Sequence, residues 1–98
     1  MMYTKDKILA ILSQNKASLT AKYPITELGL FGSFARGDFD VHSDIDILVD
    51  FKENIDGYEF IRLAHEFEDL FQHKVDMVSR RGIKPKYLPF VEQNLIHV

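Results

Sequence analysis

Two aspartates stand two residues apart in the stretch DIDILVDF, residues 44–51, and a third stands in KVDMVS, residues 74–79. Both stretches alternate as β-strands do, so Asp44 and Asp46 project from one face, about 6–7 Å apart. If the two strands are neighbours, Asp76 joins them at one end of a sheet. Clustered carboxylate oxygens suit Mg²⁺ or Mn²⁺. Taken alone, the pair Asp44 and Asp46 is more typical of solvated strand-edge residues that discourage aggregation.

A glycine–serine turn ahead of these aspartates favours the binding of an anion. Gly32 lets the backbone pass close to a ligand, and the N–H groups at the start of a helix attract negative charge. Ser33 adds a hydroxyl donor, and Arg36 adds a fixed cation suited to phosphate. A serine-capped tight turn is the simpler interpretation of Gly32 and Ser33 alone. The combination of Gly-Ser-x-x-Arg-Gly with a following Ser-Asp-x-Asp is much more specific.

Hydrophobic periodicity predicts the elements that must position these residues. We expect helices over residues 4–22, 33–36, 58–72 and 85–94, and strands over residues 25–31, 44–51 and 74–79. Thr4 is the expected N-cap of the first helix, in which Asn15 marks a candidate break into two shorter helices. This order predicts an α/β (α+β) fold, a small mixed β-sheet flanked by helices.

Length and composition narrow the class of protein. A chain of 98 residues can bury one small core, so we expect a single domain over residues 1–98. A net charge of −3 argues against a nucleic-acid coat or a membrane-surface protein, and we expect no direct nucleic-acid binding. The absence of cysteine excludes disulfides, thiolate zinc sites and cysteine nucleophiles. Without a membrane-length apolar stretch or a signal-peptide pattern, we expect a cytoplasmic protein with no membrane partner.

The motifs together resemble the signature of a known superfamily. The runs GSFARG at residues 32–37 and SDIDILV at residues 43–49 are similar to the signature of the DNA polymerase β-like nucleotidyltransferases. Over nearly its whole length the chain is similar to the minimal nucleotidyltransferases, the MNT proteins of HEPN/MNT toxin–antitoxin pairs. The resemblance implies the nucleotidyltransferase fold, and every catalytic position of the pattern is present.

The resemblance also implies roles for the motif residues. The catalytic residues would be the carboxylates that ligate two Mg²⁺ ions, with Mn²⁺ as a substitute: Asp44, Asp46 and Asp76. The residues implied to bind the nucleotide, ATP, are Gly32, Ser33, Arg36 and Ser43. An acceptor hydroxyl would attack the α-phosphate of ATP, and pyrophosphate would leave.

A partner protein follows from the same resemblance. MNT proteins act as antitoxins of HEPN toxins, and some transfer AMP to a tyrosine of the toxin, so a hetero-oligomer with a HEPN-domain toxin is implied. Two alternatives stay open. One is a non-catalytic antitoxin that neutralises the toxin by binding alone, which the intact motifs disfavour. The other is transfer to a small-molecule hydroxyl, which the lack of chain for an additional substrate domain disfavours.

A basic cluster and the histidines have weaker interpretations. The cluster consists of Arg80, Arg81, Lys84 and Lys86, and it suits a triphosphate or an acidic partner as well as it suits a solvated loop. His73 follows a predicted helix, where a cation stabilises the helix dipole. His42 is expected to be an exposed loop residue.

Overall fold

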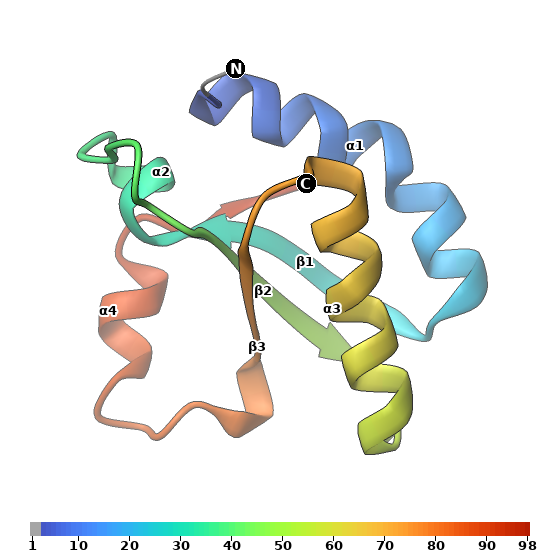
Figure 1. Cartoon of the computed structure of the whole chain (residues 1–98). Coiled ribbons are helices and arrows are strands. Elements are labelled where there is room, and N and C mark those ends of the chain that lie inside the picture. The colour runs from blue at the N-terminus through green and yellow to red at the C-terminus, as the bar shows by residue number, and fades with distance from the viewer. Residues whose placement is uncertain (1–2) are drawn as a thin grey trace.

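A mixed β-sheet forms the centre of the computed structural model, which describes residues 3–98 (Figure 1). Within these residues the sheet has four strands in the order β3-β2-β1-β4. The strands are β1 (Ile25–Phe31), β2 (Ile45–Phe51), β3 (Val75–Ser79) and β4 (Ile96–His97). Strand β1 is antiparallel to β2 and β4, whereas β2 and β3 are parallel. The expected small mixed sheet flanked by helices is confirmed.

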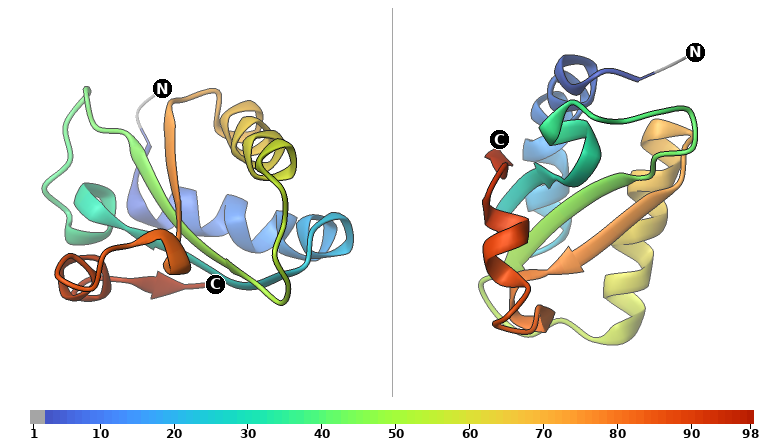
Figure 2. Two further views of the ribbon diagram at one scale, coloured as in Figure 1. Left: turned by 90° about the horizontal axis from the view of Figure 1, so that it is seen from below. Right: turned by 90° about the vertical axis from the view of Figure 1, so that its left-hand side faces the viewer.

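Two long helices cover one face of this sheet, α1 (Lys5–Lys22) and α3 (Gly57–Phe71) (Figure 2). Thr4 caps α1 by accepting a hydrogen bond from the Lys7 N–H at 3.2 Å, as expected. Asp56 caps α3 by accepting one from the Glu59 N–H at 2.8 Å. Each cap satisfies a backbone donor that the first helical turn leaves unpaired.

The core lies between these helices and the inward face of the sheet. Alternate residues of β2 supply its centre, since Ile45, Ile47 and Val49 are all fully buried. Residues at helical spacing on α1 and α3 pack against them: Ile8, Leu12, Leu19, Leu63, Phe67 and Phe71. The other face of β2 therefore carries the predicted aspartates, together with Leu48, which is also buried.

Three short helices complete the fold, α2 (Gly32–Arg36), the 3₁₀-helix η1 (Arg80–Gly82) and α4 (Leu88–Glu92). Helix α4 lies on the sheet face opposite α1 and α3 (Figure 2). No helix in residues 3–98 is long and apolar enough to cross a membrane.

Three details differ from the sequence-based expectations. Helix α1 runs unbroken through Asn15, whose side-chain amide donates to the Ile11 carbonyl at 2.8 Å, because Leu12 and Leu19 on either side are both buried in the core. The last helix covers only Leu88–Glu92, because the chain after Pro85 first makes turns. The fourth strand, β4, was not expected, and it pairs Ile96 with Leu30 of β1.

Candidate active site

Strand β1 ends next to the aspartate strand and leads directly into α2. Its last residue, Phe31, pairs with Asp46 in the antiparallel register, and Gly32 follows with a positive φ of 75°. A Cβ at Gly32 would lie 2.0 Å from Asp46 Oδ2 and 2.8 Å from Asp46 Cγ. The backbone at Gly32 therefore leaves room for the Asp46 carboxylate only because no side chain is present.

The parallel pairing of β2 and β3 extends this row to a second carboxylate. Asp76 is the register partner of Asp46, so both side chains lie on the same face of adjacent strands. Asp44 immediately precedes β2, and its Oδ2 lies 3.6 Å from Lys74 Nζ. The structure thus brings Gly32, Asp46 and Asp76 side by side from three strand ends, with Asp44 at the margin.

Electrostatics mark Asp46 as the unusual member of the cluster. Partial burial, together with the charges of Asp76 and Asp44, raises the pKa of Asp46 to about 6 against the opposing effect of Arg36. A bound cation would reverse this repulsion, because an opposite charge favours the ionised carboxylate. Oxygen ligands of this kind fit Mg²⁺, which commonly takes one or two protein carboxylates and completes its shell with water and substrate phosphates.

The side chains as they lie do not by themselves form a closed metal cage. Across residues 3–98, no group of three or more histidine, aspartate or glutamate side chains has an arrangement that could hold a metal ion. The expectation that all three aspartates bind metal therefore stays a prediction. It requires Asp44 to adjust, or the phosphates of a substrate to supply the missing oxygens.

An open pocket of about 350 Å³ adjoins Asp46. One side of the pocket is polar and is formed by the predicted residues Gly32, Ser33, Arg36 and Asp46. The apolar lining of the pocket comes from Phe31, next to Gly32, and from Phe90 and Val91 of α4. No local motif links α4 to residues 32–46, so the sequence pattern does not predict the place of this helix in the site.

Ser43 has a different place from the other predicted nucleotide-binding residues. Its hydroxyl accepts a hydrogen bond from the Asp40 N–H at 2.9 Å, and its own N–H donates to the Asp40 carbonyl at 3.1 Å. Its carbonyl lies 2.7 Å from His73 Nε2. Ser43 therefore shapes the loop before Asp44 and does not line the pocket.

His73 fastens this loop from the far end of α3. Its ring also meets the rings of Phe34 and Tyr3 edge-on, with centroids 6.4 Å and 5.9 Å apart. The carbonyl of Lys74, the next residue in the chain, accepts a hydrogen bond from the Ile45 N–H at 3.0 Å. The interpretation of His73 as a dipole-stabilising residue missed this contact, which joins residues 30 positions apart.

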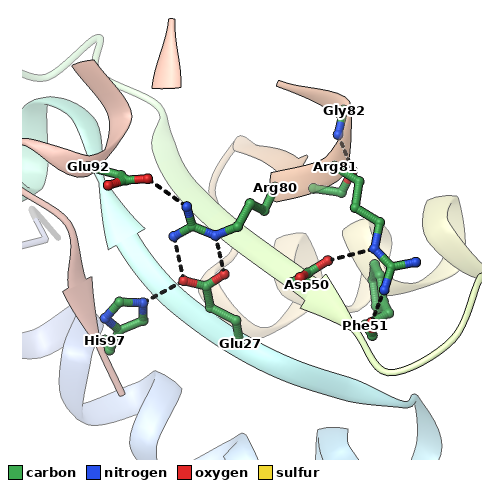
Figure 3. A network of polar contacts seen from close by, with 9 residues as sticks. Glu27, Asp50, Phe51, Arg80, Arg81, Gly82, Glu92 and His97 are labelled. Carbon is green, nitrogen blue, oxygen red and sulfur yellow. Dashed lines mark hydrogen bonds and ion pairs between the residues drawn. The ribbon is translucent and has the colours of Figure 1, made fainter. Parts of the chain in front are cut away.

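The two arginines of the basic cluster make internal contacts (Figure 3). Arg80 holds Glu27 of β1 through two bonds, Nε to Oε1 at 2.6 Å and Nη2 to Oε2 at 2.7 Å, and Glu92 of α4 through Nη1 at 2.7 Å. Hydrogen bonding from Arg80, with a further bond from His97, lowers the pKa of Glu27 to about 2 against the effect of burial.

Arg81 is held in the same way, by the Phe51 carbonyl at 2.6 Å and by Asp50 Oδ1 at 3.2 Å. Lys84 and Lys86 remain exposed. The two arginines join η1 to β1, β2 and α4. Neither a triphosphate site nor a freely solvated loop therefore describes them.

Comparison with known proteins gives matches over nearly the whole chain. A profile of the family described as nucleotidyltransferase domain matches residues 7–97. Protein adenylyltransferase MntA of Thermococcus cleftensis is 35% identical over 97 residues, which cover 99% of this chain and 98% of that protein. The solved structure of a candidate minimal nucleotidyltransferase has a TM-score of 0.76 at 32% identity, covering 93% of this chain and 95% of the other.

A crystal structure of a toxin–antitoxin with AMP-PNP has a TM-score of 0.70 at 24% identity, over 97% of this chain and 72% of the other. At that identity the likeness is one of fold. The sheet and the helices that flank it are thus arranged as in these solved structures.

Proposed function

Because the chain belongs to the nucleotidyltransferase domain family, we propose that it transfers AMP from ATP to a tyrosine hydroxyl of a HEPN-domain toxin and thereby acts as its antitoxin. In this proposal residues 1–98 work as one minimal domain. The observation that carries it is the contact of Gly32 with Asp46, beside the Asp46–Asp76 pair. It places a backbone segment that phosphate can approach next to two carboxylates on one face of the sheet.

The reaction needs little beyond position and charge. The acceptor oxygen attacks the α-phosphorus of ATP, a new P–O bond forms, and the bond to the β-phosphate breaks with release of pyrophosphate. The backbone at Gly32 and Ser33 binds the phosphates, and Arg36 neutralises part of their charge. Asp76 is exposed beside Asp46, and it orients the acceptor hydroxyl and accepts its proton.

Metal ions complete the proposed chemistry. Two Mg²⁺ ions, or Mn²⁺ in their stead, held by Asp44, Asp46 and Asp76 would stabilise the attacking and leaving oxygens. The raised pKa of Asp46 supports this assignment, because burial and the charges of Asp76 and Asp44 disfavour its ionised form, and a cation would offset both effects. Ser43, whose hydroxyl closes the loop with Asp40, contributes by holding Asp44 rather than by direct contact with the nucleotide.

The proposed partner rests on the relatives. The Thermococcus cleftensis relative is named a protein adenylyltransferase, and the AMP-PNP structure is of a toxin–antitoxin. A protein acceptor also suits a chain of this size, since the pocket at Asp46 is open on one side rather than enclosed. The acceptor tyrosine would enter from that side.

Co-expression with a HEPN-domain toxin from the same genome tests the proposal. The wild type should restore growth, and the toxin should gain the mass of one or more AMP groups. Asp44→Asn should do neither, whereas the matched control Asp69→Asn, an exposed aspartate on α3, should do both. Restored growth with Asp44→Asn and no AMP on the toxin would instead establish an antitoxin that works by binding alone.

A further inference from the structure

Helix α4 presents an aromatic ring to the pocket beside Asp46. Phe90 is 73% exposed, yet with Val91 it lines the same pocket as Gly32, Ser33 and Arg36. A large apolar side chain at the wall of a polar pocket suggests a ligand with a flat apolar part. Tyr58 of α3 is 83% exposed but lies on the other helix layer, so it offers a comparison.

The polar and apolar parts of the pocket lining match the two ends of a nucleotide. The polar side suits the triphosphate, as proposed above. The apolar side suits the nucleobase, because aromatic side chains stack on the faces of bases. We propose that Phe90 is the platform on which the adenine of ATP stacks, and that Arg80 is a positioning residue that holds this platform through Glu92. This inference rests on the proposed function, which supplies ATP as the ligand.

Helix α4 depends on contacts at its ends for its position. It has five residues, and the structure shows none of these five to be buried. Isolated helices of this length are unstable in water, since too few hydrogen bonds offset the cost of forming the first turn. The position of Phe90 must therefore be set by what holds residues 88–92 from outside.

The Arg80 contacts supply one such anchor. Glu92 follows Phe90 by two residues, and Arg80 Nη1 binds its carboxylate at 2.7 Å. The same guanidinium is fixed by two bonds to Glu27 in β1 (Figure 3), and the Glu27 side chain is only 17% exposed. Paired parallel bonds of this kind define both distance and orientation. Arg80 thus connects α4 to the rigid sheet.

Strand β4 supplies the other anchor. Ile96 pairs with Leu30, and His97 pairs with Gly29. A Cβ at Gly29 would lie 2.7 Å from Leu95 Cδ1, so the absence of a side chain there lets Leu95 pack against β1. With both anchors on β1, α4 keeps a fixed place relative to Gly32, which directly follows the same strand.

Nucleotide binding to the full chain with Mg²⁺ tests the platform, using ATP and inorganic tripolyphosphate as paired ligands. Phe90→Ala should weaken ATP about tenfold, the usual effect of removing one stacking ring. The affinity for tripolyphosphate, which has no base, should stay within twofold of the wild-type value. Phe90→Trp should restore ATP binding, and the matched control Tyr58→Ala should bind both ligands as the wild type does.

The positioning role of Arg80 is tested through its partner on α4. Glu92→Ala should weaken ATP binding about threefold without affecting tripolyphosphate binding. In the Phe90→Ala background it should cause no further loss of ATP affinity, because both changes act on one ring. Glu92 has a 48% exposed side chain, so its loss should not unfold the chain.

Each of the remaining binding results would contradict a specific part of the proposal. If the wild type binds ATP but Phe90→Ala binds it equally well, the platform is wrong while the proposed function stands. Equal weakening of ATP and tripolyphosphate would mean that Phe90 supports the phosphate side instead. Unchanged ATP binding with loss of toxin binding would make Phe90 a docking residue. A folded wild type that binds neither ligand would refute the proposed function itself.

Discussion

Replacing Gly32 by alanine should separate the catalytic geometry from the stability of the fold. The new Cβ would lie 2.0 Å from Asp46 Oδ2, whereas observed Cβ atoms keep at least 3.0 Å, so the carboxylate must move by about 1 Å. Asp46 can move in this way because its carboxyl group is the free end of a side chain. A displacement of that size at a reacting group costs on the order of 100-fold in rate.

The stability cost should be small by comparison. Alanine at a φ of 75° costs about 1–2 kcal/mol relative to glycine. Gly37 offers a matched control, because its φ is 93° and a Cβ there would meet nothing within 4 Å. Gly37→Ala should therefore lose similar stability and keep nearly full activity.

Urea unfolding and AMP transfer from ATP, measured on both variants at pH 7, give the comparison. We expect both to lose about 1–2 kcal/mol in unfolding free energy and only Gly32→Ala to lose about 100-fold in transfer rate. A Gly32→Ala enzyme within threefold of the wild type would refute the assignment of Asp46. Equal loss of activity in both variants would mean that backbone strain in α2, rather than contact with Asp46, is responsible.

Three further changes probe the charges. Glu27→Gln should remove up to about 3 kcal/mol of stability above pH 4.5, and this difference should vanish as the pH falls toward 2 in urea titrations, because Arg80 lowers the Glu27 pKa to about 2 only in the folded state. Asp46→Asn should abolish transfer yet raise the unfolding free energy in chelator at pH 7 by about 1 kcal/mol, since it removes a repelled, half-buried charge; a loss of stability in chemical denaturation would contradict this. Tyr23→Phe should cost about 1 kcal/mol, because Tyr23 donates to Glu66. Burial and this bond raise the pKa of Tyr23 to about 12, so the ultraviolet titration of the wild type should contain a step near pH 12 that Tyr23→Phe lacks; identical titrations of the two proteins would contradict the contact.

The elements with strong periodicity could be predicted from sequence. Residues of α3 that recur at spacings of three and four face the core as expected, and the alternation in β2 correctly separates Ile45 and Ile47 from Asp46. Such patterns are local, because each reflects the burial of one face of one element. Asp76 was expected to join Asp46 only if their two strands are neighbours, and the parallel pairing of β2 with β3 confirms that they are.

What could not be predicted depends on contacts between distant residues. Strand β4 has only two residues and is defined by its pairing with β1, so it has no periodicity of its own. Glu27 and Arg80 are separated by 53 positions, and nothing near Arg80 distinguishes an internal ion pair from a solvated charge. No local motif marks Phe90 as a site residue, for the same reason. The apolar side of the candidate site is built by long-range contacts, whereas the polar side lies within local motifs.

The proposed function requires this chain to transfer AMP to a protein hydroxyl. The most direct measurement incubates the chain with Mg²⁺, ATP labelled on its α-phosphate and a HEPN-domain toxin from the same genome. Beside the wild type stands the double variant Asp44→Asn/Asp46→Asn. We expect the wild type to label the toxin on a tyrosine, mapped by mass spectrometry, and the double variant to leave it unlabelled. Unlabelled toxin with the folded wild type, or equal labelling with the double variant, would contradict it.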